Sequence, residues 1–159
     1  MIRIHPPQHR ASTGLTLIEM VVVAALLSIL TMVTFPVAKY SYKRSKEIEL
    51  RSALRDMRSA IDEFKRYSDA GLIPVELGTD GYPPDLETLV EGVEVVGQVE
   101  MKVRFLRRIP IDPMTGSDEW LLLSYQDEPD ATTWGGENVF DVRTTSGGVG
   151  LNGVPYGEW

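Results

Sequence analysis

The sequence predicts an α+β fold, with a long N-terminal helix packed on a small antiparallel β-sheet near the C-terminus. Three observations predict it. Residues 20–38 form an uncharged apolar run, residues 50–64 carry apolar side chains at helical spacing, and the best strand candidates all come after residue 119.

Composition argues against several classes of function. The chain has 159 residues, no cysteine and a formal charge of −7. Both histidines, His5 and His9, lie in the first fourteen residues with Arg3, Arg10 and no acid, so the rest of the chain has a formal charge of −9. An acidic chain is a poor partner for nucleic acid. Without histidine, cysteine, S-x-x-K or G-x-S-x-G, that remainder gives no sign of a nucleophile with its base, and we do not expect an enzyme.

The apolar run allows three interpretations. Its nineteen residues reach about 30 Å as a helix with a rise of about 1.5 Å per residue, enough for a bilayer core. A secretory signal cut after its core should have a shorter core, and Pro36 fits poorly just before a cut at Ala38. A plain signal-anchor leaves Gly14 and Glu19 unexplained. The third interpretation is a cut before the run, directly after Gly14.

The residues around Gly14 favour the third interpretation. A short basic leader, the sequence GLTLIE and the apolar run together resemble the class III signal of type IV pilins and type II secretion pseudopilins. In that family a prepilin peptidase cuts after the glycine and methylates the new amino group. Here the new N-terminus would be Leu15, where the usual residue is phenylalanine. The resemblance implies a type IV pilin-like fold, organised as a leader (1–14), a helix (15–70, membrane span about 15–38) and a globular part (71–159).

Glu19 and Pro36 acquire roles from the same resemblance. A carboxylate inside hydrocarbon costs a few kcal/mol unless it finds a partner. Glu19 could be a boundary residue that reaches back to the headgroups. The resemblance implies instead that it pairs with the α-amino group of Leu15 in a neighbouring subunit and so selects the register of assembly. Pro36 resembles the proline that bends the helix in the family.

The orientation of the chain in a membrane is predicted differently by charge and by resemblance. Basic residues are more numerous after the apolar run (Lys39, Lys43, Arg44 and Lys46) than before it (Arg3 and Arg10). The positive-inside rule alone would therefore place the C-terminal part in the cytoplasm. The resemblance implies a single-pass inner-membrane protein whose C-terminal part lies in the periplasm, and we follow the resemblance.

The rest of the chain supplies the expected globular elements. Apolar residues at spacings of four and three (Leu50, Leu54, Met57, Ile61 and Phe64) predict one buried helix face, which ends near Gly71. A short helix is expected after Asp85. The sequence RIPIDPMTG over residues 108–116 resembles a turn of the major type II pseudopilin. Strand candidates are residues 120–125 and 139–143, with a looser segment at 148–154.

Two weaker motifs concern ligands. Residues 148–153 match G-x-G-x-x-G, but too few residues follow for a βαβ unit, so we reject a dinucleotide site. Acids and an amide gather between residues 127 and 141, and hard oxygen ligands suit calcium. Major pseudopilins have a structural calcium site in this region, although their Asp-rich pattern is absent here. Solvated turns are the alternative. The predicted calcium ligands are Asp127, Asp130, Asn138 and Asp141.

The sequence thus predicts a structural subunit of a type II secretion pseudopilus, with a type IV pilin of a surface filament as the alternative. The resemblance implies four partners: other copies of the chain, minor pseudopilins, prepilin peptidase and the inner-membrane assembly platform. A membrane-anchored enzyme and a tethered calcium-binding module that never polymerises are the competing classes. Neither of those classes has a need for Gly14 and Glu19.

Overall fold

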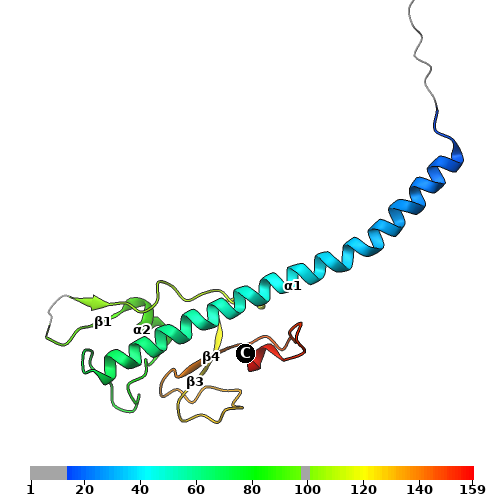
Figure 1. Cartoon of the computed structure of the whole chain (residues 1–159). Coiled ribbons are helices and arrows are strands. Elements are labelled where there is room, and N and C mark those ends of the chain that lie inside the picture. The colour runs from blue at the N-terminus through cyan, green and yellow to red at the C-terminus, as the bar shows by residue number, and fades with distance from the viewer. Residues whose placement is uncertain (1–13, 98–100) are drawn as a thin grey trace, which may run out of the picture. The chain divides into compact units, whose positions relative to one another are not determined.

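The computed structural model describes residues 14–97 and 101–159, so the predicted leader lies outside the described residues apart from Gly14. Side chains are described throughout these ranges except at 33–35. The chain divides into two compact units, Met1–Ser41 and Tyr42–Trp159, and helix α1 (Leu17–Asp69) contributes to both. The α+β fold predicted from the sequence is confirmed: one long helix is followed by small antiparallel sheets (Figure 1).

Helix α1 ends where the sequence predicts. Gly71 has a φ of +68°, a left-handed conformation that glycine adopts without a steric penalty. The N–H of Gly71 donates to the carbonyl of Ser68 at 2.9 Å, and the N–H of Leu72 donates to the carbonyl of Tyr67 at 3.0 Å. These two bonds form a Schellman motif, which satisfies carbonyls that the end of a helix would otherwise leave unpaired.

The core of the second unit is built on the predicted apolar stripe of α1. All five residues of the stripe are buried, and Leu50, Met57 and Ile61 are fully so. They pack in one cluster with residues from each later part of the chain, among them Leu89, Val139 and Val142. One face of the helix therefore organises the whole globular unit, as its 3.6-residue periodicity requires.

The remaining elements are short. Asp85 caps α2 (Leu86–Glu91) by accepting hydrogen bonds from the N–H and the hydroxyl of Thr88, at 2.7 and 2.6 Å. The elements after α2 are β1 (Val93–Glu94), β2 (Lys102–Val103), β3 (Trp120–Leu123), β4 (Asp141–Thr144) and the 3₁₀ helix η1 (Tyr156–Glu158). β1 pairs with β2 and β3 pairs with β4, both antiparallel.

Two details differ from the sequence prediction. The ribbon β1–β2 was not predicted, because strands of two residues carry too little alternation to be recognised. The looser third strand candidate forms only an isolated bridge between Val149 and Pro155, followed by η1. Trp120–Leu123 and Asp141–Thr144 overlap the other two strand predictions.

The predicted turn at 108–116 anchors the sheet to the rest of the unit. Asp112 is fully buried, and its carboxylate accepts hydrogen bonds from the N–H of Met114 at 2.7 Å and from the hydroxyl of Thr144 on β4. The indole N–H of Trp120 donates to the carbonyl of Pro110 at 2.9 Å. A buried donor left without an acceptor costs about 1–3 kcal/mol, so these bonds fix the turn against both strands.

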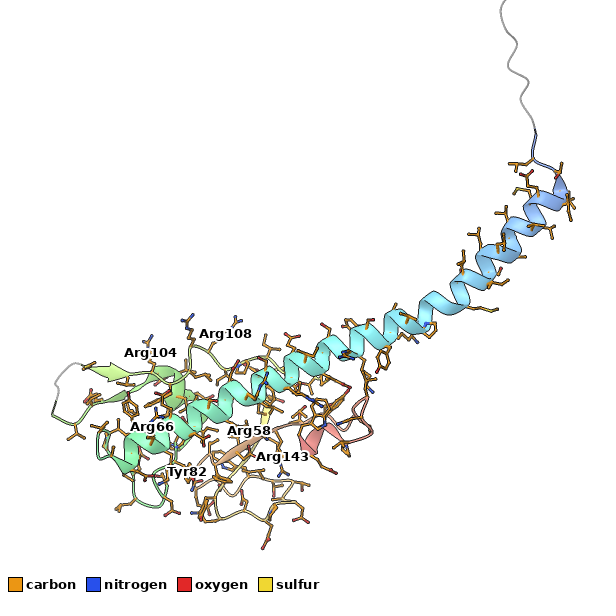
Figure 2. The ribbon with its side chains drawn as sticks, in the orientation of Figure 1. Arg58, Arg66, Tyr82, Arg104, Arg108 and Arg143 are labelled. Atoms are coloured by element: carbon orange, nitrogen blue, oxygen red, sulfur yellow. The ribbon has the colours of Figure 1, made fainter. Side chains whose placement is uncertain are left out.

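The segment 148–159 docks along α1. Lys43 donates to the carbonyl of Val149 at 2.7 Å, and buried Glu47 accepts from the N–H of Leu151 and the hydroxyl of Tyr156 at 2.8 and 2.9 Å. Further along the helix, the guanidinium of Arg58 donates to the carbonyl of Trp159 at 2.7 Å (Figure 2). Polar contacts made by three residues of one helix therefore hold this segment in place.

Glycines allow the aromatic rings of this segment to approach its backbone. A Cβ at Gly148 would lie 2.9 Å from the Tyr156 ring, and one at Gly150 would lie 2.6 Å from the Trp159 ring. Real Cβ atoms do not tolerate such contacts. Packing therefore explains the first two glycines of the G-x-G-x-x-G pattern, and the third, Gly153, has a φ of +82°.

The Glu47–Tyr156 contact predicts a loss of stability in alkali. Burial raises the pKa of Tyr156 to about 12, and the hydrogen bond to Glu47 adds to the rise. An unfolded tyrosine ionises near pH 10. The native state therefore keeps a proton that the unfolded state releases, and this contribution is complete below about pH 10 and lost as the pH rises through 12. In urea unfolding followed by tryptophan fluorescence, Tyr156→Phe should lose less stability than the wild type over this range.

Tyr42→Phe is the matched control, because Tyr42 is exposed and has no carboxylate contact among the described residues. It should behave as the wild type does. Equal alkaline losses in Tyr156→Phe and Tyr42→Phe would contradict the assignment.

Candidate functional site

The first unit presents an apolar surface with nothing packed on it. Among the described residues, α1 is the one helix long and apolar enough to cross a membrane, and its most apolar eighteen-residue stretch is not buried at all. Large apolar side chains are exposed all along it, including Leu17, Val21, Leu26, Leu30 and Val37. A soluble monomer rarely leaves so large an apolar surface in water. This surface requires hydrocarbon, other helices, or both.

Polar side chains in this stretch are satisfied by the helix itself. The hydroxyl of Ser28 donates to the carbonyl of Ala24, and that of Thr31 donates to the carbonyl of Leu27, both at 2.8 Å. Such bonds to the preceding turn let hydroxyl groups enter an apolar environment without an unpaired donor. The carboxylate of Glu19 has no comparable bond among the side chains described in this unit. Glu19 is the polar group here that calls for a partner.

Thr16 caps the N-terminus of α1. Its hydroxyl oxygen accepts from the N–H of Glu19 at 3.3 Å, and its carbonyl accepts from the N–H of Met20 at 3.1 Å. Thr16 was not predicted to have a role of its own, although T-x-x-E is the pattern of a capping box. Glu19 stands at the third helical position, where a negative charge also interacts favourably with the helix dipole.

The predicted processing residues, Gly14 and Leu15, and the second predicted assembly residue, Pro36, lie at the two ends of this surface. Gly14 and Leu15 precede α1, and both are exposed; a Cβ at Gly14 would meet no other atom within 4 Å. Gly14 and Leu15, between which the predicted cut lies, are therefore both exposed. Pro36 lies inside α1 and has no N–H to donate to the carbonyl of Met32.

The predicted calcium ligands mostly have other partners. Asp141 is paired with Arg58 at 2.6 Å between Oδ1 and Nε. Asn138 is fully buried, with its Oδ1 accepting from the N–H of Tyr125 at 3.0 Å and its Nδ2 donating to Gln126 at 3.0 Å. Within residues 14–97 and 101–159, no group of three or more His, Cys, Asp or Glu side chains is arranged to hold a metal ion.

Asp127 is the predicted ligand that lies near a second carboxylate. Its Oδ2 accepts from the N–H groups of Ser124 and Gly135, at 2.7 and 3.1 Å. Its Oδ1 lies 2.6 Å from the point where a Cβ of Gly135 would stand, and Oε2 of Glu137 lies 2.4 Å from the same point. Two carboxylates thus converge over a glycine, and Glu137 was not among the predicted ligands. Asp130 is exposed in the same loop.

Comparison with known families bears on the apolar unit. Residues 9–35 match the prokaryotic N-terminal methylation motif. This motif is the class III signal peptide of type IV pilin-like proteins, and it indicates a filament subunit of the type IV pilin kind. The match covers Gly14, Leu15 and Glu19 together with most of the exposed apolar surface. No curated protein and no solved structure matches the chain.

The motif supports the choice made from GLTLIE between the three interpretations of the apolar run. Proteins of this kind are structural subunits that a prepilin peptidase processes and that assemble into filaments. We call residues 15–38, which carry the exposed apolar side chains, the Thr16 cap and Glu19, the N-terminal assembly helix, after the role that the sequence predicts for them.

Proposed function

We propose that the chain is a structural subunit of a type II secretion pseudopilus, a periplasmic filament that drives protein export. The observation that carries this proposal is the N-terminal assembly helix: an exposed apolar helix that lies largely within the methylation motif. Before assembly this surface is covered by the bilayer. In the filament it is covered by the same helices of neighbouring copies.

Glu19 gives this assembly its register. In a bundle of apolar helices, the Glu19 carboxylate is stable only where it meets a positive charge. The α-amino group of a processed Leu15 in the next copy supplies that charge and comes from the same short segment. An incoming subunit that is shifted along the helix axis leaves both charges unpaired, so the ion pair selects a single axial position. Pro36 lets the helix bend within the bundle.

The proposed location is the inner membrane, crossed once, with the second unit in the periplasm. The excess of basic residues after the span opposes this orientation. Lys43, however, donates to the carbonyl of Val149 and lies 5.9 Å from the centre of the Tyr156 ring, and Lys46 lies 5.2 Å from that of Tyr42. Both residues therefore have a role in the folded unit, which explains their presence without a topological signal.

The turn at 108–116 supports a pseudopilin over a subunit of a surface filament. It resembles the turn of the major type II pseudopilin, and Asp112 at its centre is a buried anchor of the sheet. The absence of cysteine points the same way, since many surface pilins carry a C-terminal disulfide. On this proposal the partners are other copies of the chain, minor pseudopilins, prepilin peptidase and the assembly platform of the inner membrane.

Calcium in the loop between β3 and β4 is a second part of the proposal. It is supported by the resemblance and by the convergence of Asp127 and Glu137 over Gly135. Asp141 is paired with Arg58, so we test calcium binding at Asp127 instead.

Processing is tested on protein purified from its native membrane. We expect the intact mass and the N-terminal sequence to report a chain that begins at Leu15 and carries one added methyl group. An uncut chain, or one cut after residue 38, would rule out a pilin-like subunit. Loss of secretion without loss of surface filaments on deletion of the gene would favour the pseudopilus over the surface pilus.

Glu19→Ala should abolish filaments while leaving the second unit folded. Removing one partner of a buried ion pair costs about 3–5 kcal/mol, which corresponds to more than about a hundredfold in an assembly equilibrium. Filaments are counted by electron microscopy, and folding is checked by tryptophan fluorescence. Ser28→Ala is the matched control, because the Ser28 hydroxyl is already bonded within its own helix. Unchanged filament numbers in Glu19→Ala would remove its assembly role.

Calcium is tested by thermal unfolding of the purified chain in calcium or in a chelator. We expect calcium to raise the midpoint of the wild type, because a ligand that binds only the native state stabilises it. Asp127→Asn should lose the response, whereas Glu128→Gln, a change to a neighbouring acid outside the convergence, should keep it. Equal midpoints of the wild type with and without calcium would disprove the calcium site.

A further inference from the structure

Helix α1 carries a repeated charge pattern in the second unit. An acid, an apolar residue and a base follow one another three times at intervals of seven: Glu49-Leu50-Arg51, Asp56-Met57-Arg58 and Glu63-Phe64-Lys65. The apolar member is buried each time. Successive residues lie about 100° apart around a helix, so the acids lie on one flank of the buried stripe and the bases on the opposite flank.

Some of these charges are already paired within the chain. Arg58 binds Asp141, Lys65 binds Asp69, and Glu63 binds Arg66. Among the described residues, Glu49, Arg51 and Asp56 of these repeats form no ion pair, and neither does Arg55, which lies on the basic flank. These four residues belong to the same two turns of α1.

A depression lies on the basic flank. It is lined by Arg51, Leu54, Arg55, Arg58, Asn152 and Trp159. The Arg51 guanidinium lies 4.1 Å from the centre of the Trp159 ring, and Arg58 is fixed by Asp141 and by the Trp159 carbonyl. The ring of Trp159 thus holds the Arg51 guanidinium in place. The depression presents donors and an apolar wall, a combination that suits a carboxylate side chain.

A groove lies on the acidic flank, between α1 and the turn that starts at Arg108. Glu49, Asp56 and Asp118 line it with Arg108, so carboxylates outnumber guanidinium groups by three to one. Small residues, Ser52 and Ala53, form its floor on the helix. Around α1, Glu49 and Asp56 of the groove lie on one side of the buried stripe, and Arg51 and Arg58 of the depression lie on the other. The groove and the depression therefore belong to opposite flanks of one helix.

We propose that the basic depression of one copy docks onto the acidic groove of the next copy. Arg51 and Arg55 of the first copy would pair with Glu49, Asp56 and Asp118 of the second. The occupant is a second copy of this chain, because the two surfaces have opposite charge and lie at the same height on the same helix. This inference rests on the proposed function and adds a contact between globular units to the contact between apolar helices.

The contact joins two different surfaces, which has a consequence for assembly. Each docked copy still offers one unused surface at either end, so growth does not stop at a dimer. Because these charges are exposed, the contact adds little binding free energy, and salt weakens it. Its main effect is to fix the relative position and orientation of neighbouring copies.

Cross-linking in the native membrane tests the contact. Because the chain has no cysteine, introduced cysteines are its only thiols. Asn152→Cys marks the basic depression and Ser52→Cys marks the acidic groove, and both changes leave every charge in place. With a short bis-maleimide, the double variant should give a ladder of oligomers. Each single variant should stay monomeric. Dimers from either single variant would show a symmetric contact and overturn the proposal.

Charge reversal in the double-cysteine variant tests whether the contact depends on pairing of opposite charges. Arg51→Glu with Arg55→Glu should reduce the ladder about tenfold or more, because like charges then face one another. Adding Glu49→Arg and Asp56→Arg should restore it, which a merely misfolded variant would not do. Lys102→Glu with Arg104→Glu makes the same change in net charge at exposed residues outside both surfaces and should leave the ladder intact.

The outcomes separate this contact from the proposed function. Filaments in electron micrographs without a ladder would overturn the contact and leave the filament subunit standing. A ladder without filaments would support the contact and overturn the proposed function. A ladder that survives the first reversal would overturn the charge pairing.

Discussion

The constraint on which the rest depends is that one helix serves two environments. Between residues 17 and 32, α1 exposes apolar side chains on every side, whereas residues 50–64 bury one stripe against the chain's own sheet. Apolar surface in water costs about 25 cal/mol per Å², so the first stretch needs an outside partner and the second already has an inside one. The methylation motif lies where the outside partner is needed.

Polar groups follow the same division. In the first stretch the hydroxyls of Ser28 and Thr31 donate to backbone carbonyls of the same helix. The carboxylate of Glu19 has no such bond among the described residues of this stretch. In the second unit, Glu47 and Arg58 reach residues about a hundred positions away, Tyr156 and Trp159. Polar side chains in the second unit thus bind distant residues of the same chain, whereas those in the first stretch bind only their own helix.

Local signals predicted much of this architecture. The spacing of Leu50 and Met57 gave the buried face, Gly71 marked the helix end, and Asp85 marked a cap, because each depends on a few neighbouring residues. Contacts between distant residues could not be predicted. Asp141 was chosen as a calcium ligand because sequence shows a carboxylate but not the guanidinium of Arg58, 83 positions earlier, that binds it.

The docking of the C-terminal segment has a mechanical consequence. Its contacts with Lys43, Glu47, Arg51 and Arg58 are spread along the axis of α1. A force applied along that axis loads them in parallel, so they resist together. A force that lifts the segment from its end loads them one after another. When a subunit is pulled by its N-terminal helix, these contacts therefore resist the force together. They resist least when the segment is pulled perpendicular to the helix axis.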